Sequence, residues 1–296
     1  MFRPVARSSS AAASISPAPR EQIATFAPSP ASSRAIARPS PFDAPVTIAA
    51  LPESPSSIVV LLRGDTVPWP LVCEVLAVAF AEPRSFAELR AWSLSLELLG
   101  FAGEGWGVAW RDSDRVTGYR NPVPMAQDAA GVERLSSVRS DRFLVHLRKP
   151  SEGFPPVLGD TQPFVEPDGS FAFCHNGFLE RHADYRPTFS GELQGEADSE
   201  VGFRFFASRL REDEDPGTAL ALTHETFGGR ANLGYLPGTG SMLVHAAHPT
   251  NPLWRFQLDA AEIASTAIHR DDEALFDQVF PGAVDRRRVE GTAPVG

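Results

Sequence analysis

The composition of the chain changes abruptly at Cys73, and this change limits which part of it can fold. Residues 1–71 hold 12 of the 27 prolines, together with many Ser and Ala and only scattered apolar residues. Such a segment buries too little apolar surface to offset the entropy lost on ordering, so we predict that residues 1–71 form a disordered, low-complexity extension. The apolar run at residues 73–80 predicts a buried strand that opens a folded domain spanning residues 72–296.

Charge and hydropathy exclude several classes of partner. The chain has a net charge of -10, although residues 1–71 are slightly basic, so the folded domain is strongly acidic. An acidic surface argues against nucleic acid and anionic membranes as partners. No apolar stretch reaches transmembrane length and no secretory signal is evident, so we expect a cytoplasmic protein in which Cys73 and Cys174 stay reduced. The Arg, Ser and Ala bias of residues 1–71 resembles an organellar transit peptide, but frequent proline disfavours the amphipathic helix of such a peptide.

Apolar periodicity predicts strands and helices without a regular strand–helix–strand repeat. Residues 85–99 have helical spacing, with Ser85 as a candidate N-cap and Gly100 as the stop. Two short apolar runs around a polar turn predict a hairpin over residues 108–119. This mixture favours an α+β fold over a doubly wound one. The other expected strands cover residues 142–147, 170–174, 241–247, 253–258 and 262–268, and the other expected helices cover residues 199–211 and 218–227.

Three short polar clusters lie where apolar runs end or helices begin: His-Leu-Arg at 146–148, His-Asn-Gly at 175–177 and Asp-Ser-Glu at 198–200. Loops at such places commonly present side chains to a ligand. Each cluster also has an ordinary structural interpretation. Asn-Gly is typical of a hairpin turn, Asp-Ser-Glu of a helix cap with acidic residues in the first turn, and an arginine after a strand of a surface charge.

Taken in order, these clusters resemble the class II glutamine amidotransferases, a family of N-terminal-nucleophile hydrolases. The order is Cys73 at the first strand, Gly-Trp-Gly at 105–107, His-x-Arg, His-Asn-Gly and then Asp-Ser-Glu. The resemblance extends from Cys73 to about Phe280 and is greatest to the stand-alone YafJ-like group, whose C-terminal strand is similar to residues 263–267. It implies a four-layer αββα fold with two antiparallel sheets between helices.

The resemblance also implies a nucleophile and an oxyanion site. The Cys73 thiol would attack the side-chain amide carbon of a γ-glutamyl group and form a thioester, with the free α-amine of Cys73 as general base. Asn176, through its side chain, and Gly177, through its backbone N–H, would stabilise the oxyanion. The supporting residues of the site would be Trp106, Gly107, His146 and His175.

The substrate's amino-acid end requires charges of both signs. Arg148 would bind the α-carboxylate through a bidentate fork, aided by the hydroxyl of Ser151, and Asp198 would bind the α-ammonium. The same Arg148 and Asp198 could instead be ordinary ion-pair partners. No cofactor is expected. Although His245 and His248 lie three residues apart, carboxylate partners are missing nearby, so no metal site is predicted.

The sequence departs from the family pattern at two positions near the site. Gln162 stands where the family usually has the histidine of a His-Pro-Phe motif, so any role of that histidine is lost. Ala197 precedes Asp198 in place of the usual Thr or Ser, which removes a hydroxyl. Cys174 is interpreted as a small apolar strand residue.

The family requires a cysteine at the mature N-terminus, but Val72 precedes Cys73. Residues 1–71 could be a non-native start, with translation beginning at the codon of Val72, or a propeptide that is removed. The alternative is a catalytically inactive γ-glutamyl-binding module or regulatory subunit. The expected function is hydrolysis of glutamine or another γ-glutamyl amide, by a free-standing hydrolase or by a subunit that works with a synthase or acceptor subunit.

Overall fold

Strand β1 (Glu74–Ser85) begins directly after Cys73 and forms the centre of the larger of two sheets. The computed structural model describes residues 73–100, 102–149, 155–266 and 272–296, all of which belong to one compact unit. The expected extension at residues 1–71 and the predicted substrate-binding residue Ser151 therefore lie outside the described residues.

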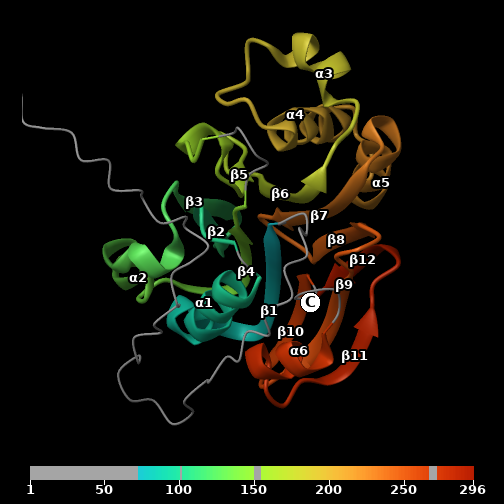
Figure 1. The fold of residues 1–296 in the computed structure, drawn as a ribbon. Helices are drawn as coiled ribbons and strands as arrows, with labels where there is room; N and C mark the ends of the chain where they lie inside the picture. Colours follow the sequence, from blue (N-terminus) through green and yellow to red (C-terminus); the bar gives the residue numbers. More distant parts are fainter. Residues whose placement is uncertain (1–72, 101, 150–154, 267–271) are drawn as a thin grey trace, which may run out of the picture. The chain divides into compact units, whose positions relative to one another are not determined.

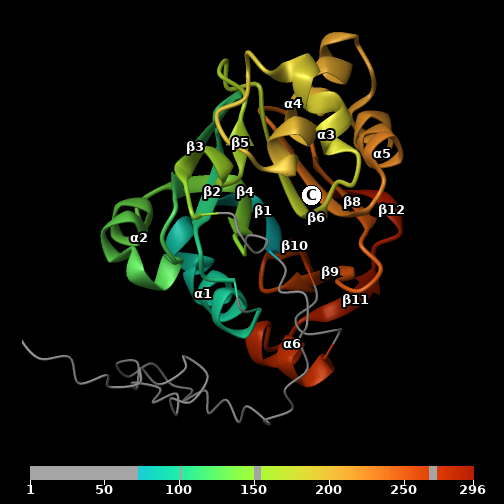
Figure 2. The same ribbon diagram turned by 45° about the horizontal axis from the view of Figure 1, so that its top comes forward.

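Both sheets are antiparallel throughout their described pairings. The larger sheet has seven strands and the smaller has five (Figures 1 and 2). In spatial order the larger sheet contains β11 (Val284–Arg288), β9 (Leu253–Leu258), β10 (Ala261–Thr266), β1, β4 (Arg139–Leu147), β2 (Trp106–Asp112) and β3 (Arg115–Asn121). The smaller sheet contains β12 (Gly291–Val295), β8 (Met242–Ala247), β7 (Arg230–Pro237), β6 (Phe171–Phe178) and β5 (Phe164–Val165).

Helices cover the outer face of each sheet, as Figure 1 shows, with α4 and α5 on the β6–β7 side and α1 and α6 on the side of β1 and β10. The helices are α1 (Arg90–Leu99), α2 (Ala129–Leu135), α3 (His182–Tyr185), α4 (Asp198–Arg211), α5 (Pro216–Phe227) and α6 (Glu273–Val279). Short 3-10 turns are η1 (Phe86–Glu88), η2 (Met125–Gln127), η3 (Leu158–Asp160) and η4 (Arg186–Phe189). No helix in these ranges is long and apolar enough to cross a bilayer.

Strand β1 shows how the layers are built. Alternate residues of a strand face opposite sides of the sheet. Leu76 and Val78 pack with the helix-facing core, whereas Val75 and Ala77 pack with the core between the two sheets. A third core joins the smaller sheet to α4 and α5. These three cores between four layers confirm the expected αββα architecture.

Most expected elements are present, with shifted ends. Ser85 caps the 3-10 turn η1 through a capping box, and α1 follows it only from Arg90. The hairpin at 108–119 is β2 and β3. The structural interpretation of Asn-Gly as a turn is wrong: both residues lie inside β6, which continues to Phe178. The sequence patterns do not predict β5, β7, β11, β12, α2, α3 and α6.

Candidate active site

Cys73 directly precedes β1 of the larger sheet and contacts Asn176 on β6 of the smaller sheet. Its sulfur accepts a hydrogen bond from the backbone N–H of Lys149 at 3.2 Å, and its thiol lies 3.4 Å from the carbonyl oxygen of the same residue. Desolvation of the sulfur raises the pKa of the Cys73 thiol to about 11. In the chain with Val72 attached, the thiol is therefore protonated at neutral pH, and the nitrogen of Cys73 is an amide without basic character.

Asn176 contacts Cys73 from the smaller sheet. Its side-chain amide nitrogen donates a hydrogen bond to the carbonyl oxygen of Cys73. The next residue, Gly177, has φ +135, and a Cβ atom there would overlap the carbonyl oxygen of Arg230 on β7. Only glycine can therefore follow Asn176 here. The structure brings both predicted oxyanion donors together at the end of β6, beside the start of β1.

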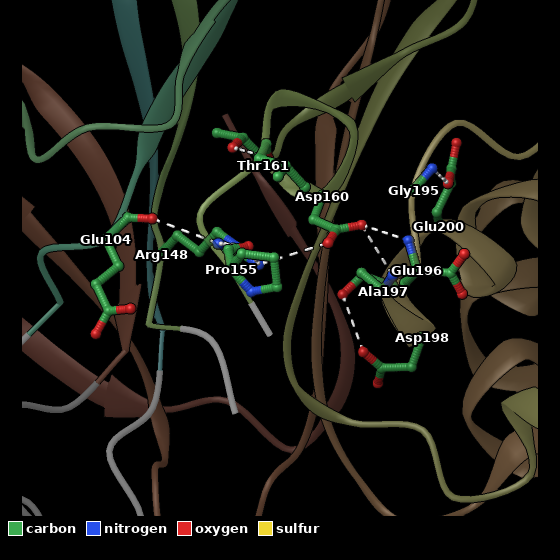
Figure 3. A network of polar contacts seen from close by, with 12 residues as sticks. Glu104, Arg148, Pro155, Asp160, Thr161, Gly195, Glu196, Ala197, Asp198 and Glu200 are labelled. Atoms are coloured by element: carbon green, nitrogen blue, oxygen red, sulfur yellow. Dashed lines mark hydrogen bonds and ion pairs between the residues drawn. The ribbon is translucent and has the colours of Figure 1, made fainter. Parts of the chain in front are cut away.

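Arg148 directly follows β4, and its side chain is almost fully buried. The guanidinium lies 3.7 Å from the carboxylate of Asp160 and within 3.5 Å of the carbonyl oxygens of Glu104 and Pro155. Figure 3 shows Asp160 between Arg148 and the chain that leads into α4. The predicted carboxylate-binding group thus already has a buried counter-charge.

Asp160 also organises the start of α4, where the third cluster lies. One of its carboxylate oxygens accepts the backbone N–H groups of Glu196 at 2.7 Å and Ala197 at 2.9 Å (Figure 3). Asp198 is the first residue of α4, and its carboxylate accepts the N–H of Leu179 at 2.7 Å. Asp160 therefore connects the residues predicted to bind the two ends of an amino acid.

The two histidines of the motifs are neutral at physiological pH. His146 is fully buried, and its Nε2 lies 3.1 Å from the carbonyl oxygen of His175, so that nitrogen carries the proton. Burial lowers the pKa of His146 to about 3 and lowers the pKa of His175 below its ordinary value. His175 in turn lies 3.2 Å from the hydroxyl of Ser199. These contacts suit a supporting role rather than proton transfer.

Gln162, which lies between η3 and β5, binds the backbone of the His-Asn-Gly strand. Its side chain accepts the N–H of His175 at 2.6 Å and donates to the carbonyl of the same residue at 3.1 Å. Gly107 leaves room for this contact, because a Cβ atom there would overlap the carbonyl oxygen of Gln162. Trp106 is fully buried and donates to Asp128 at 3.0 Å, which places it in the core beneath the site.

Several site residues gave no signal in the sequence analysis. Asp160 and Asn232 belong to segments without a recognised motif, and their contacts join parts of the chain far apart in sequence. Glu74, the residue after Cys73, is fully buried and accepts a hydrogen bond from the hydroxyl of Thr266. Burial raises the pKa of Glu74 to about 8. A carboxyl group that can be protonated at neutral pH therefore lies beside Cys73.

Within the described residues, no group of three His, Cys, Asp or Glu side chains is placed to hold a metal ion. His245 instead contacts the hydroxyl of Thr292 at 2.8 Å, and His248 accepts the N–H of Asn251 at 3.0 Å. Cys174 is fully buried in β6 and faces the core between the two sheets, as expected for a small apolar residue.

The four-layer fold and the approach of Asn176 to Cys73 agree with the expected resemblance to amidotransferases of the N-terminal-nucleophile type. The family model of class II glutamine amidotransferases matches residues 72–234. The chain therefore belongs to the class II glutamine amidotransferases. A comparison with curated proteins found no match.

Two solved structures share the fold. Glutamine phosphoribosylpyrophosphate amidotransferase from B. subtilis has a TM-score of 0.58 and 19% identity, with 75% of this chain and 48% of that one covered. A structure described as the allosteric regulatory enzyme of purine biosynthesis has a TM-score of 0.60 and 18% identity, with 75% and 46% covered. The present chain thus matches about half the length of these two proteins.

Proposed function

We propose that this protein hydrolyses the side-chain amide of glutamine or a similar γ-glutamyl compound, with Cys73 as the nucleophile. The contact that carries the proposal is the hydrogen bond from the Asn176 side-chain nitrogen to Cys73. It places the amide expected to stabilise an oxyanion within reach of the thiol-bearing residue. Burial lowers the pKa of His146 to about 3, which makes it a weak base, and the base we propose is the α-amine of a mature N-terminal Cys73.

The reaction has two steps, formation of a thioester on Cys73 and its hydrolysis. The free amine of Cys73 takes the thiol proton, the sulfur attacks the amide carbon, and the carbonyl oxygen becomes an oxyanion that accepts from Asn176 and from the N–H of Gly177. The amine then gives its proton to the leaving nitrogen, ammonia departs, and a γ-glutamyl thioester remains. Water attacks this thioester and releases glutamate and the free thiol.

Opposite charges select the amino-acid end of the substrate. The Arg148 guanidinium would donate to the α-carboxylate while Asp160 keeps it in place, and Ser151 would add a hydroxyl. The partly exposed carboxylate of Asp198 would accept from the α-ammonium. The released ammonia would either diffuse away or pass to an acceptor subunit, which would make this chain the glutaminase part of a complex.

The mechanism requires that no residue precedes Cys73 in the active form. The test is a form of the protein that begins at Cys73, produced by removing the preceding residues from the folded full chain. It should release ammonia from glutamine or another γ-glutamyl amide and should be labelled at Cys73 by a glutamine-analogue electrophile. Cys174→Ala is the matched control and should behave like the wild type. Label on Cys174, or activity of Cys73→Ala, would contradict the assignment.

A second candidate is a γ-glutamyl-binding module without catalysis. It is favoured by Val72, which makes the nitrogen of Cys73 an amide in this chain, and by burial, which raises the pKa of the Cys73 thiol. The same experiment separates the two. A binding module would bind glutamate or glutamine but release no ammonia, even when the chain begins at Cys73.

A further inference from the structure

Asn232 of β7 lies directly opposite Asn176 of β6 in the antiparallel register. Both side chains are fully buried. The side-chain nitrogen of Asn232 donates to Oδ1 of Asn176 at 2.9 Å and to the backbone carbonyl oxygen of Asn251 at 2.8 Å. One side-chain amide thus connects the loop after β8 to the residue that contacts Cys73.

The Asn251 carbonyl determines the orientation of both amides. A backbone carbonyl oxygen can only accept, so the atom of Asn232 that faces it is the nitrogen. The same nitrogen faces Asn176, whose nearest atom must then be the acceptor Oδ1. The nitrogen of Asn176 consequently points to Cys73, where it donates to another backbone carbonyl. Rotating either amide by half a turn would place acceptor against acceptor.

Of the two described donors to Oδ1 of Asn176, Asn232 makes the shorter contact. The other donor to Oδ1 of Asn176 is the side chain of Asn251, at the longer distance of 3.4 Å. Within the part of the chain that the structure describes, Oδ1 of Asn232 has no hydrogen-bond partner. The Asn232 side chain therefore makes its described hydrogen bonds through its nitrogen alone, and it acts as a donor in both of them.

We propose that Asn232 is a positioning residue that keeps the nitrogen of Asn176 directed at the reacting centre. The inference rests on the proposed function, because the oxyanion is where that nitrogen would act. Without the donor at Asn232, Oδ1 of Asn176 keeps only the longer contact from the Asn251 side chain, so its nitrogen is held less firmly toward the oxyanion. The substrate's charged end is bound elsewhere, so its affinity should change little.

The kinetic test uses the form that begins at Cys73, produced from the folded full chain. Asn232→Asp replaces the donor by an acceptor and should lower kcat by about a hundredfold, and Asn232→Leu, which only removes the donor, by about tenfold. KM should stay within about threefold of the wild-type value. In an Asn176→Ala background neither substitution should lower kcat further, because Asn232 acts through Asn176.

Leu233→Val is the matched control for general damage. Leu233 is the next residue of β7 and is equally buried, but its side chain packs in the core with α4 and α5. The control should lower thermal stability and leave kcat unchanged. A wild-type kcat in Asn232→Asp, or a further loss of kcat in the Asn176→Ala background, would overturn the proposal.

A second measurement does not depend on turnover. In the full chain, nuclear Overhauser contacts should join the side-chain NH2 protons of Asn176 to protons of Cys73, and Asn232→Asp and Asn232→Leu should weaken them. If the wild-type form beginning at Cys73 releases no ammonia from γ-glutamyl amides, the proposed function is wrong, and these contacts alone decide the role of Asn232. If the contacts between Asn176 and Cys73 persist unchanged in both variants, the positioning role of Asn232 is wrong.

Discussion

The Arg148 guanidinium and the Asp160 carboxylate form an ion pair at 3.7 Å in which both side chains are almost fully buried. A buried charge is stable only beside its partner, because neither ion is solvated by water. Asp160 holds Arg148 with one oxygen and the two backbone N–H groups before α4 with the other. The pair therefore links the two charges expected to bind an amino acid, and it is open to direct measurement.

Asp160→Asn should remove the ion pair and keep an oxygen for the two N–H groups. We expect it to lower the free energy of unfolding by about 3–5 kcal/mol, since it leaves the charge of Arg148 buried without a partner. Chemical denaturation measures this change. The control is Glu196→Gln, which removes the more exposed pair with Arg186 and should cost less than about 1 kcal/mol. If the two variants lower the free energy of unfolding equally, the buried pair contributes no more to stability than the exposed pair.

Binding and chemistry should separate in the kinetics of three variants. Arg148→Lys, which keeps a charge beside Asp160 but loses the fork, and Asp198→Asn should mainly raise KM, by about tenfold or more, because each loses a charged hydrogen bond to the substrate. Asn176→Ala should lower kcat by about a hundredfold with little change in KM. Steady-state assays of ammonia release give both constants. The same kinetic signature for all three would refute this division of roles.

The reactivity of Cys73 in the full chain should follow its raised pKa. Because burial raises the pKa of this thiol to about 11, the thiolate fraction should rise about tenfold per pH unit between pH 7 and pH 10. The rate of alkylation by iodoacetamide, followed by mass spectrometry, should rise in parallel. Cys174, whose pKa burial also raises, should stay unlabelled because the core encloses it. A rate that levels off near pH 8 would contradict the raised pKa.

Glu74 should make stability depend on pH. Burial raises the pKa of its carboxyl from 4.5 to about 8, so between these values the unfolded chain loses a proton that the folded chain retains. Stability is therefore greatest below pH 4.5 for this group and falls as pH rises towards 8, by at most about 1.4 kcal/mol per pH unit.

Glu74→Gln should abolish this fall. Relative to the wild type, the variant should become progressively more stable from pH 5 to pH 8, as measured by denaturation at each pH. Glu133→Gln, on the exposed side of α2, should stay parallel to the wild type. A difference between Glu74→Gln and the wild type that does not change with pH would show that the carboxyl is ionised in the folded protein throughout this range.

Local sequence accounts for much of the fold. Apolar runs predict β1 and the β2–β3 hairpin, and the segments expected to be helical correspond to α4 and α5, because local runs and spacings report burial within one element. Strand β7 was not predicted. It is buried along almost its whole length between two neighbours of the smaller sheet, so its residues do not alternate, and it contains a glycine and ends at a proline. The ends of β6 shifted for a related reason, since the pairing with β7 extends the strand through Asn176 and Gly177.

The sequence by itself determined the order of the motifs and their family, and it indicated Cys73 as the candidate nucleophile, because these depend on residue types at fixed positions along the chain. Only the tertiary structure decided how the motifs meet. The contact between Asn176 and Cys73 joins the two sheets, and the pair of Arg148 and Asp160 joins the end of β4 to the 3-10 turn η3. Asn232 donates to the side chain of Asn176 across the β6–β7 pairing. These contacts depend on strand register and on the packing of the layers. Both result from the burial of all the strands together, so the sequence pattern of a single segment does not predict them.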